Sequence, residues 1–471
     1  MSQSFSAHSR NVSLVVAASM FMQILDGVII VTALPQMAHD FGVATLDMSI
    51  GITAYMLMAA VVIPTASWLS DRFGARRVFL IAMLVFTLSS LACGLATDLT
   101  QFVVARIVQG AGGALMFPIG RVIVLRSVQK SEIVRAIGLT VWPALFAPVV
   151  GPAIGGFLTT YVSWHWNFWI NVPLGIAGML LVANIIPRDT EFKAHPFDWA
   201  GFVLTAISLA ALLYGFDGLA QGTLPLPLAA GLSILGLAVG TGAVLWLRRA
   251  SHPLLDLQTL RIPTFAASEA MAGAVLRLTI NATPFLLPLM FQVGFGFDPL
   301  AAGGLVLVYF LGNLLMKTVT TPILRRFGFR SILTLNGTLA GLAIIGCGFL
   351  SADTFYPLTF AILFVAGLTR SMQFTALATL AFADVDGDKR SSASTLSSMF
   401  QQISMVFGVA LAAAILNISQ VVRGAPALGL HDFRVAFFAV GALCVAASLQ
   451  LLVLPRDAGS EVSGHRQSQA A

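Results

Sequence analysis

Charged residues are scarce in this sequence: Asp, Glu, Lys and Arg make up 10% of the 471 residues, whereas hydrophobic residues make up 58%. Soluble domains average about 25% charged and about 45–50% apolar residues. No water-soluble fold could bury this much apolar surface, and the composition also excludes a disordered chain, a coiled coil and a disulfide scaffold. The sequence therefore predicts a polytopic membrane protein. We attribute its net charge of +6 to loops, not to nucleic-acid binding.

Groups that enzymes and metalloproteins use are also few. The three cysteines, Cys93, Cys347 and Cys444, lie in apolar stretches without the spacing of a disulfide or zinc site. The seven histidines lie in tails, loops or the ends of apolar stretches, which leaves carboxylates to carry protons inside the membrane. No lysine follows a glycine, so the phosphate-binding loop of ATPases is absent. We expect no metal, no cofactor and no enzymatic activity.

Apolar runs of helical length, separated by charges and Pro/Gly clusters, predict fourteen membrane spans. The first contains Asp26 and is long, which favours an uncleaved helix over a signal peptide. The predicted spans cover residues 12–34, 47–69, 78–97, 100–125, 134–159, 165–187, 198–219, 225–247, 265–292, 299–323, 331–351, 355–382, 391–417 and 433–454.

The basic residues predict the orientation. If the amino terminus and every second loop face the cytoplasm, 20 of the 26 Lys and Arg residues lie there or at adjoining helix ends, and only Arg423 and Arg434 lie outside. This positive-inside bias places both termini in the cytoplasm. The remaining four basic residues lie within spans: Arg106, Arg277, Lys317 and Arg370.

An internal repeat predicts how the spans are grouped. An Arg-Phe-Gly-x-Arg loop occurs at residues 72–76 and 326–330, and an Arg-x-x-Gln pair occurs at residues 106–109 and 370–373. The separations are similar and span eight predicted helices, which favours two six-span halves with two extra helices between them, although chance matches of such short motifs are the alternative. Parallel six-span repeats are the plan of rocker-switch transporters. The predicted domains are an amino-terminal six-helix bundle (1–190), two inserted helices with a cytoplasmic linker (191–263), a carboxyl-terminal six-helix bundle (264–455) and a disordered cytoplasmic tail (456–471).

The sequence resembles the major facilitator superfamily, in particular its fourteen-span drug:proton antiporter branch, over nearly the whole chain. Four segments carry the resemblance: Ser67-Trp68-Leu69-Ser70-Asp71-Arg72-Phe73-Gly74-Ala75-Arg76 after span 2, Arg106-Ile-Val-Gln109-Gly110 in span 4, Gly151-Pro152-Ala-Ile-Gly155-Gly156 in span 5, and Trp164-His165-Trp166-Asn167-Phe168-Trp169-Ile170-Asn171-Val172-Pro173-Leu174-Gly175 in span 6. The resemblance implies the all-α major facilitator fold, two six-helix bundles plus two extra helices. It also implies proton-coupled efflux of small molecules across a bacterial inner membrane.

The sequence departs from the branch in several places. Val28 and Val31 stand where span 1 of the branch has Thr and Asn, so Asp26 lacks two polar neighbours. Ser67 and Ala75 replace a Gly and a basic residue, and Ala147 stands where the span 5 motif often has its first Gly. These changes affect details of the site and not the fold.

Asp26 is the candidate proton carrier. It lies about fourteen residues into span 1, roughly 20 Å from the cytoplasmic end of the helix at about 1.5 Å per residue. An ionised Asp at that depth costs about 2.5–3.5 kcal/mol, so we expect it to exchange a proton near neutral pH. The alternative is an Asp fixed to a cation for structural reasons. Arg106, which the resemblance places on a cavity-lining helix, could bias the protonation of Asp26 or extend outwards to the membrane surface.

Arg277 and Arg370 lie near the middle of their spans, too deep to reach the surface. Glu269 precedes Arg277 by eight residues, a rise of about 12 Å on a continuous helix, so we do not expect the two to pair. The cavity should then be net positive, and we hypothesise a carboxylate or other anionic substrate bound by Arg277 and Arg370, together with Gln109 and Gln373. The alternative is hydrogen bonding of the two arginines to backbone carbonyls. For Lys317, which lies nearer the cytoplasmic end of its span, extension to the surface is favoured over binding.

Gating residues are expected at the cytoplasmic mouth: Asp71, Arg72 and Arg76 as a charged latch and Gly74 at a tight turn, with a positive-inside anchor as the alternative. The span 5 motif (Gly151, Pro152, Gly155, Gly156) is expected in a kinked, closely packed hinge helix, or else in a merely irregular one.

We therefore predict a proton-driven antiporter that exports small molecules by alternating access. The expected partners are substrate, protons and membrane lipid, with no nucleic acid and a monomeric chain. A proton-coupled uptake symporter of an organic anion is the nearest alternative, and a non-transporting membrane sensor or assembly partner is the alternative from another class.

Overall fold

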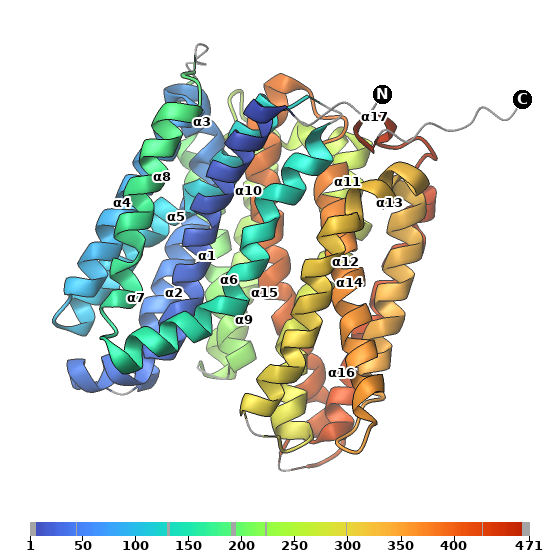
Figure 1. Ribbon diagram of the computed structural model, residues 1–471. Coiled ribbons are helices and arrows are strands. Elements are labelled where there is room, and N and C mark those ends of the chain that lie inside the picture. The colour runs from blue at the N-terminus through green and yellow to red at the C-terminus, as the bar shows by residue number, and fades with distance from the viewer. Residues whose placement is uncertain are drawn as a thin grey trace, which may run out of the picture.

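The structure is a computed structural model that describes residues 6–43, 45–129, 132–189, 195–221, 224–297, 299–425 and 427–463. The described residues form helices joined by short connections (Figure 1). The helices are α1 (Ala7–Phe41), α2 (Thr45–Val62), α3 (Ala66–Phe73), α4 (Ala75–Leu95), α5 (Leu99–Ser127), α6 (Ile133–Tyr161), α7 (Trp166–Trp169), α8 (Asn171–Ile185), α9 (Trp199–Gln221), α10 (Leu226–Leu247), α11 (Pro263–Glu269), α12 (Ala272–Leu289), α13 (Pro299–Gly348), α14 (Tyr356–Leu380), α15 (Arg390–Val422), α16 (Leu430–Gln450) and α17 (Ser460–Ser463).

Twelve helical segments of the described chain are long and apolar enough to cross a membrane. The difference from the predicted fourteen has two sources. One of the twelve segments, within α13, covers two predicted spans. The backbone turns between them at Gly328, where φ is 71° and ψ is 167°, a conformation that favours glycine. In addition, the twelve do not count α6, which is 29 residues long and covers the predicted fifth span, because the side chains of several of its residues lie outside the described part of the structure. Figure 1 shows the chain turning back within α13.

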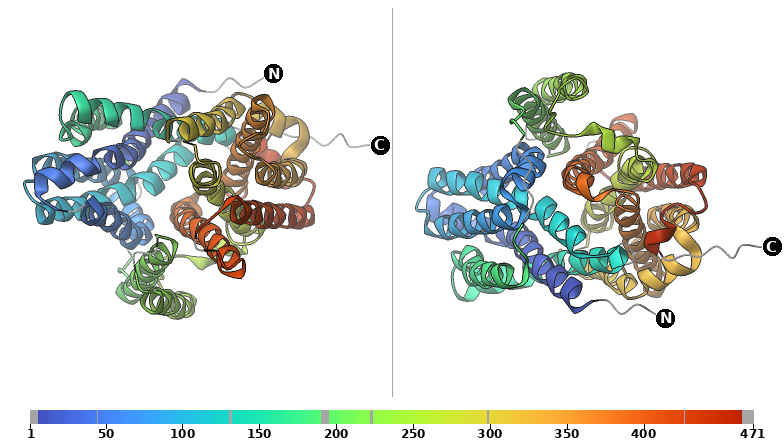
Figure 2. Two further views of the ribbon diagram at one scale, coloured as in Figure 1. Left: turned by 90° about the horizontal axis from the view of Figure 1, so that it is seen from below. Right: turned by 90° about the horizontal axis from the view of Figure 1, so that it is seen from above.

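The helices run side by side, and the start of α1 and the short helix α17 lie at the same end of the molecule (Figure 1), which we call the terminus face. Figure 2 shows α9 and α10 as a separate pair at the edge of the molecule. They pack against each other, and α9 also contacts α2 and α15. Phe216 of α9 lies against Phe407 of α15, with ring centroids 4.4 Å apart.

The carboxyl-terminal tail is helical in part. Within the segment that the sequence predicts to be disordered, α17 buries Val462, which is 1% exposed. Gly459 precedes it with a φ of 66° and lies against Phe329 of α13. Residues 464–471 lie outside the described part of the chain.

The two halves of the chain meet near the terminus face. Ser394 of α15 donates to the carbonyl of Pro118 in α5 at 2.7 Å, and Ser391 donates to the carbonyl of Ser67 in α3 at 3.3 Å. Arg390 donates to the carbonyl of Leu125. These contacts join α15 of the carboxyl-terminal half to α3 and α5 of the amino-terminal half, so the seam between the halves is closed there.

Candidate functional site

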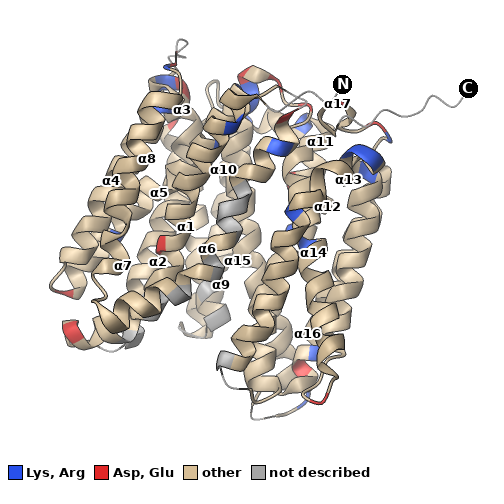
Figure 3. Cartoon of the chain, viewed as in Figure 1, with Lys and Arg blue, Asp and Glu red and all other residues tan. Residues whose placement is uncertain are grey.

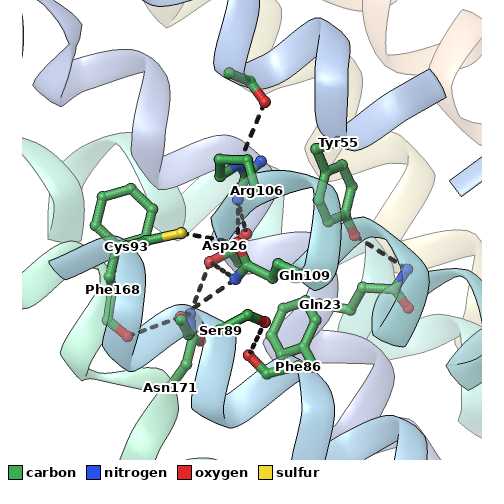
Figure 4. A network of polar contacts seen from close by, with 12 residues as sticks. Gln23, Asp26, Tyr55, Phe86, Ser89, Cys93, Arg106, Gln109, Phe168 and Asn171 are labelled. Atoms are coloured by element: carbon green, nitrogen blue, oxygen red, sulfur yellow. Dashed lines mark hydrogen bonds and ion pairs between the residues drawn. The ribbon is translucent and has the colours of Figure 1, made fainter. Parts of the chain in front are cut away.

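Asp26 of α1 lies inside the amino-terminal half, in a network of polar contacts with residues of α4, α5 and α8 (Figure 4). Arg106 of α5 donates to Asp26 Oδ2 at 2.7 Å. Gln109 of α5 and Asn171 of α8 both donate to Asp26 Oδ1, at 2.9 and 2.8 Å. Ser90 of α4 accepts from the same two amides, at 3.2 and 2.9 Å. Each of these five residues is at most 2% exposed.

Arg106 points inwards and not to the membrane surface. Its Nη1 also donates to Gln109 Oε1 at 2.6 Å, and its Nε lies 3.5 Å from the carbonyl of Gly51 in α2. The guanidinium carbon lies 4.4 Å from the ring centroid of Tyr55, a cation–π distance. A buried arginine with these partners is fixed beside the carboxylate, which excludes the snorkelling alternative in this conformation.

This arrangement suits reversible proton binding. Ionised Asp26 has its charge balanced by Arg106 and receives three hydrogen bonds, so it tolerates burial. A proton on Asp26 would remove the acceptor for at least one of these donors and leave the charge of Arg106 unbalanced. The two protonation states therefore demand different arrangements of α1, α5 and α8, which is what a coupling site requires.

Sequence reasoning grouped Asp26 with Arg106, assigned Gln109 to substrate binding instead, and missed Asn171 and Ser90 as neighbours of Asp26. The span 6 motif contained Asn171, and that was the available signal. Nothing in the sequence singles out Ser90. Asn171, Ser90 and Gln109 give Asp26 polar surroundings, although Val28 and Val31 replace the two polar residues that the branch has in span 1.

The expectation that Glu269 and Arg277 do not pair is wrong. Arg277 Nη2 lies 2.8 Å from Glu269 Oε1, and both side chains are at most 1% exposed. The helical rise fails as a guide because the helix is broken: Met271, between α11 and α12, has φ −100° and ψ −124°. The turn also needs a glycine, since a Cβ on Gly273 would lie 2.0 Å from the carbonyl oxygen of Ser268.

Arg370 and Lys317 are the deep cations of the carboxyl-terminal half for which the described residues include no acidic partner within ion-pair distance. Figure 3 shows basic residues at mid-depth beside α12 and α14. The Arg370 guanidinium lies 5.8 Å from the ring centroid of Tyr309, and Lys317 donates to the hydroxyl of Thr375. Asn313, which is 1% exposed, has no partner for either amide atom. Of the two arginines predicted to make this half positive, Arg277 is thus paired with an acid, and Arg370 has no acidic partner among the described residues.

Gln373 does not approach the Asp26 site. It donates to the carbonyl of Leu333 at 3.0 Å and accepts from Asn336 at 3.0 Å, so it holds α14 to the second arm of α13. Its counterpart Gln109 instead donates to the Asp26 carboxylate. The repeated Arg-x-x-Gln pair therefore has different contacts in the two halves.

The expected gating residues lie at the terminus face, joined through two residues that the motif does not include. Arg126 bridges Asp71 at 3.3 Å and Asp189 at 3.4 Å. Asp189 also accepts from the backbone N–H of Arg76 at 2.9 Å, and Arg76 donates to the carbonyl of Ala183. These contacts join α3, α4, α5 and the end of α8 within one half.

The other two gating residues also lie at the connection between α3 and α4. Gly74 has a φ of 90°, and a Cβ there would lie 2.7 Å from Asp189 Oδ2. The neighbouring Arg72 is exposed.

The span 5 motif lies on α6, which runs beside α1 (Figure 1). A Cβ on Gly151 would lie 2.8 Å from Val28 Cγ1, two residues beyond Asp26. Gly155 is buried, whereas a Cβ on Gly156 would meet nothing within 4 Å. The side chain of Pro152 lies outside the described part of the structure. Gly151 thus permits close packing of α6 on α1, the helix that carries Asp26.

The family model and the related sequences agree on the family to which the chain belongs. The family model of the Major Facilitator Superfamily matches residues 16–408 and 269–469. The chain is 37% identical over 413 residues to the "Putative multidrug resistance protein MdtD" of Salmonella paratyphi A, covering 86% of this chain and 85% of the relative. It is 34% identical over 464 residues to the protein of the same name from Escherichia fergusonii, covering 97% of each.

Solved structures share the fold at low sequence identity. The human organic anion transporter MFSD10 (TETRAN) superposes with a TM-score of 0.67 at 14% identity, covering 94% of this chain and 99% of that one. The fucose:proton symporter FucP of E. coli superposes with a TM-score of 0.61 at 12% identity, covering 93% and 98%. Together with the family match, these likenesses show that the chain is a multi-span membrane transporter of the Major Facilitator Superfamily.

Proposed function

We propose that this protein exports small molecules in exchange for protons, and that Asp26 is the group that carries the proton. The observation that supports this most directly is the buried Asp26–Arg106 pair with its amide partners Gln109 and Asn171. A scaffold or sensor gains nothing obvious from an ionisable pair at this depth. The names of the MdtD relatives and the span 5 motif favour export over uptake.

In the proposed cycle, protonation from the outer side neutralises Asp26 and weakens its hold on Arg106. The freed donors then favour a different packing of α1 against α5, and the halves rock so that the site opens to the cytoplasm. Proton release there restores the ion pair and resets the transporter. Each proton entering contributes about 2.3 kcal/mol per 100 mV of membrane potential, in addition to the pH gradient.

We further propose that the substrate is anionic. Arg370 and Lys317 are basic groups within predicted spans without acidic partners among the described residues, and Asn313, one turn before Lys317 in α13, has unsatisfied amide atoms. Leaving such charges uncompensated is costly, and a carboxylate would satisfy both cations. The two separate cations suit a dicarboxylate better than a single anionic group.

The protein is proposed to lie in the inner membrane of a Gram-negative bacterium as a monomer, with both termini in the cytoplasm. The terminus face is then the cytoplasmic face, in agreement with the positive-inside bias of the sequence. The gating role of Asp71, Arg72, Gly74 and Arg76 follows from their place at that face.

Purified protein in liposomes with an imposed pH gradient tests the proposal. Export requires that solute move against the proton flux and that Asp26→Asn abolish this coupled movement. Solute flux in the same direction as the protons would establish a symporter instead. If wild-type protein moved neither carboxylates nor lipophilic cations under any gradient, the transport cycle proposed here would be rejected.

A further inference from the structure

A second buried ionic cluster lies apart from Asp26, in the seam between the two halves. It contains Glu269 of α11, Arg277 of α12, Ser397 and Gln401 of α15, and Arg121 of α5. The first four belong to the carboxyl-terminal half, and Arg121 belongs to the amino-terminal half. We call these five residues the seam cluster.

The seam cluster is a continuous chain of hydrogen bonds across the boundary. Arg121 donates to Ser397 Oγ at 2.7 Å, and Ser397 donates to Glu269 Oε1 at 2.7 Å. Arg277 reaches the same carboxylate oxygen at 2.8 Å. Gln401 completes the bridge: in the amide orientation that satisfies both partners, its oxygen accepts from Arg277 at 3.0 Å and from Arg121 at 3.2 Å.

Arg121 is held in the seam by aromatic rings as well. Its guanidinium carbon lies 4.7 Å from the ring centroid of Phe117 on its own helix and 5.4 Å from that of Phe382, which follows α14 in the other half. Arg121 is only 9% exposed. Its charge therefore sits between the halves.

The charges of the seam cluster depend on a single carboxylate. Arg121 and Arg277 are the cations that the structure places near Glu269, from α5 and α12, while α15 contributes the uncharged Ser397 and Gln401. At the opposite end of α11, Asp384, which follows α14, accepts from Thr264 at 2.9 Å. The second oxygen of Glu269, Oε2, is buried without a hydrogen-bond partner, so it can accept a proton.

We propose that Glu269 is a second proton-coupling residue, which as a carboxylate holds the cytoplasmic side of the seam closed and as a protonated acid releases it. Neutral Glu269 would leave Arg121 and Arg277 as two buried like charges sharing Gln401. Their repulsion and desolvation would be relieved by separation of α5 from α12 and α15, which opens the seam towards the cytoplasm. This rests on the proposed proton-coupled cycle but concerns a different residue from Asp26 and a step at the cytoplasmic face.

Spin–spin distance measurement across the cytoplasmic face tests the proposal without substrate or transport. Spin labels are attached to cysteines introduced at two exposed positions, Gln129, just after α5, and Arg326, in α13. The three native cysteines are buried. The background variant is Asp26→Asn in lipid nanodiscs, so that the Asp26 proton does not contribute. Because no flux is measured, failure of the export proposal does not affect the result.

The expected result is that Glu269→Gln shifts the distance distribution towards the longer, open form, raising the open-to-closed ratio by roughly 5- to 150-fold, the usual range of coupling between sites. In the background variant the same shift should appear as the pH is lowered, and the Glu269→Gln variant should no longer respond to pH. The double variant Glu269→Gln with Arg121→Gln also removes one of the two cations, so it should restore the closed distribution.

Two further variants separate the proposal from general damage. Ser397→Ala removes the hydroxyl that links Arg121 to Glu269 and should open the seam partially if Glu269→Gln does not fold. Asp384→Asn is the matched control, because it removes an acid near the other end of α11 without touching the seam cluster, and it should leave the distances unchanged. A closed seam in both Glu269→Gln and Ser397→Ala, or a pH response that persists in Glu269→Gln, would overturn the proposal.

Discussion

Arg106 Nη1 and Asp26 Oδ2 are 2.7 Å apart inside the amino-terminal half, and both side chains are almost fully buried. Breaking a buried ion pair by removing one partner leaves an uncompensated charge and typically costs about 3–5 kcal/mol. Arg106→Gln should therefore lower the free energy of unfolding by several kcal/mol in detergent, as measured by thermal unfolding. The double variant Arg106→Gln with Asp26→Asn leaves no charge behind and should recover most of the loss. A double variant no more stable than Arg106→Gln alone would show that the pair does not hold these helices together.

Asn171 donates directly to the Asp26 carboxylate at 2.8 Å. A hydrogen bond to the ionised form favours that form, so removing the donor should make the proton easier to bind and harder to release. Asn171→Ala is therefore expected to move the pH profile of transport to higher pH, as measured by initial rates in liposomes over a range of external pH. Asn167→Ala is a suitable control, because Asn167 lies one turn earlier and donates to Thr159 instead. An unshifted profile in Asn171→Ala would separate Asn171 from proton coupling.

The buried position of Asp26 could be predicted from the sequence, whereas the charge pairing in the other half could not. Asp26 could be found because an acid in a long apolar run is costly to insert and therefore indicates a functional group. Arg106 could be found because it lies in a motif of span 4 that the resemblance places on a cavity-lining helix. The Glu269–Arg277 pair could not be found, because Ala270 and Met271 carry no signal that breaks a helix, and only Gly273, which fits against Ser268, hints at the break. Contacts across the seam, such as Arg121 to Ser397, depend on how the two halves dock, and local sequence does not encode that.

The basic pair Arg370 and Lys317 provides a test of substrate charge. If a dicarboxylate binds there, Arg370→Gln and Lys317→Gln should each reduce its transport at least about tenfold, since each charge-assisted hydrogen bond contributes about 1.5–3 kcal/mol. Transport of a lipophilic cation should fall much less or rise. Arg326→Gln, which neutralises an exposed arginine on the same arm of α13 as Lys317, is the control. Equal losses for both solutes would contradict the anionic-substrate proposal.

Asp40 and Trp164 form a pH-dependent contact at the face opposite the termini. Trp164 Nε1 donates to Asp40 Oδ2 at 2.7 Å, and this hydrogen bond, with a further one from His39, lowers the pKa of Asp40 below its usual value of 3.8. A lowered pKa in the folded state means that the contact stabilises the protein above the unfolded pKa and is lost as the pH falls through the folded one. Trp164→Phe should thus be less stable than wild type at neutral pH. Because Asp40 is largely exposed, we expect the hydrogen-bond part of the loss to be under about 1 kcal/mol. In an Asp40→Asn background, wild-type Trp164 and Trp164→Phe should no longer differ in the pH dependence of their stability. A stability difference between wild type and Trp164→Phe that stayed constant down to about pH 3 would show that packing of the ring alone is responsible.

Gly273 connects the backbone of the broken helix to the charge network of the seam. A Cβ at this position would lie 2.0 Å from Ser268 O and 2.7 Å from Ala267 O, both backbone atoms that cannot move aside without displacing α11. Gly273→Ala should therefore push Glu269 away from Arg277 and destabilise the protein by about 1–3 kcal/mol, the usual cost of overpacking. Gly303→Ala in α13 is the matched control, since a Cβ there meets nothing within 4 Å and alanine has a higher helix propensity than glycine. If the seam cluster holds the cytoplasmic side closed, Gly273→Ala should also open the seam in the distance measurement, whereas Gly303→Ala should not. A stable Gly273→Ala variant with a closed seam would mean that α11 can shift while Glu269 keeps its partners.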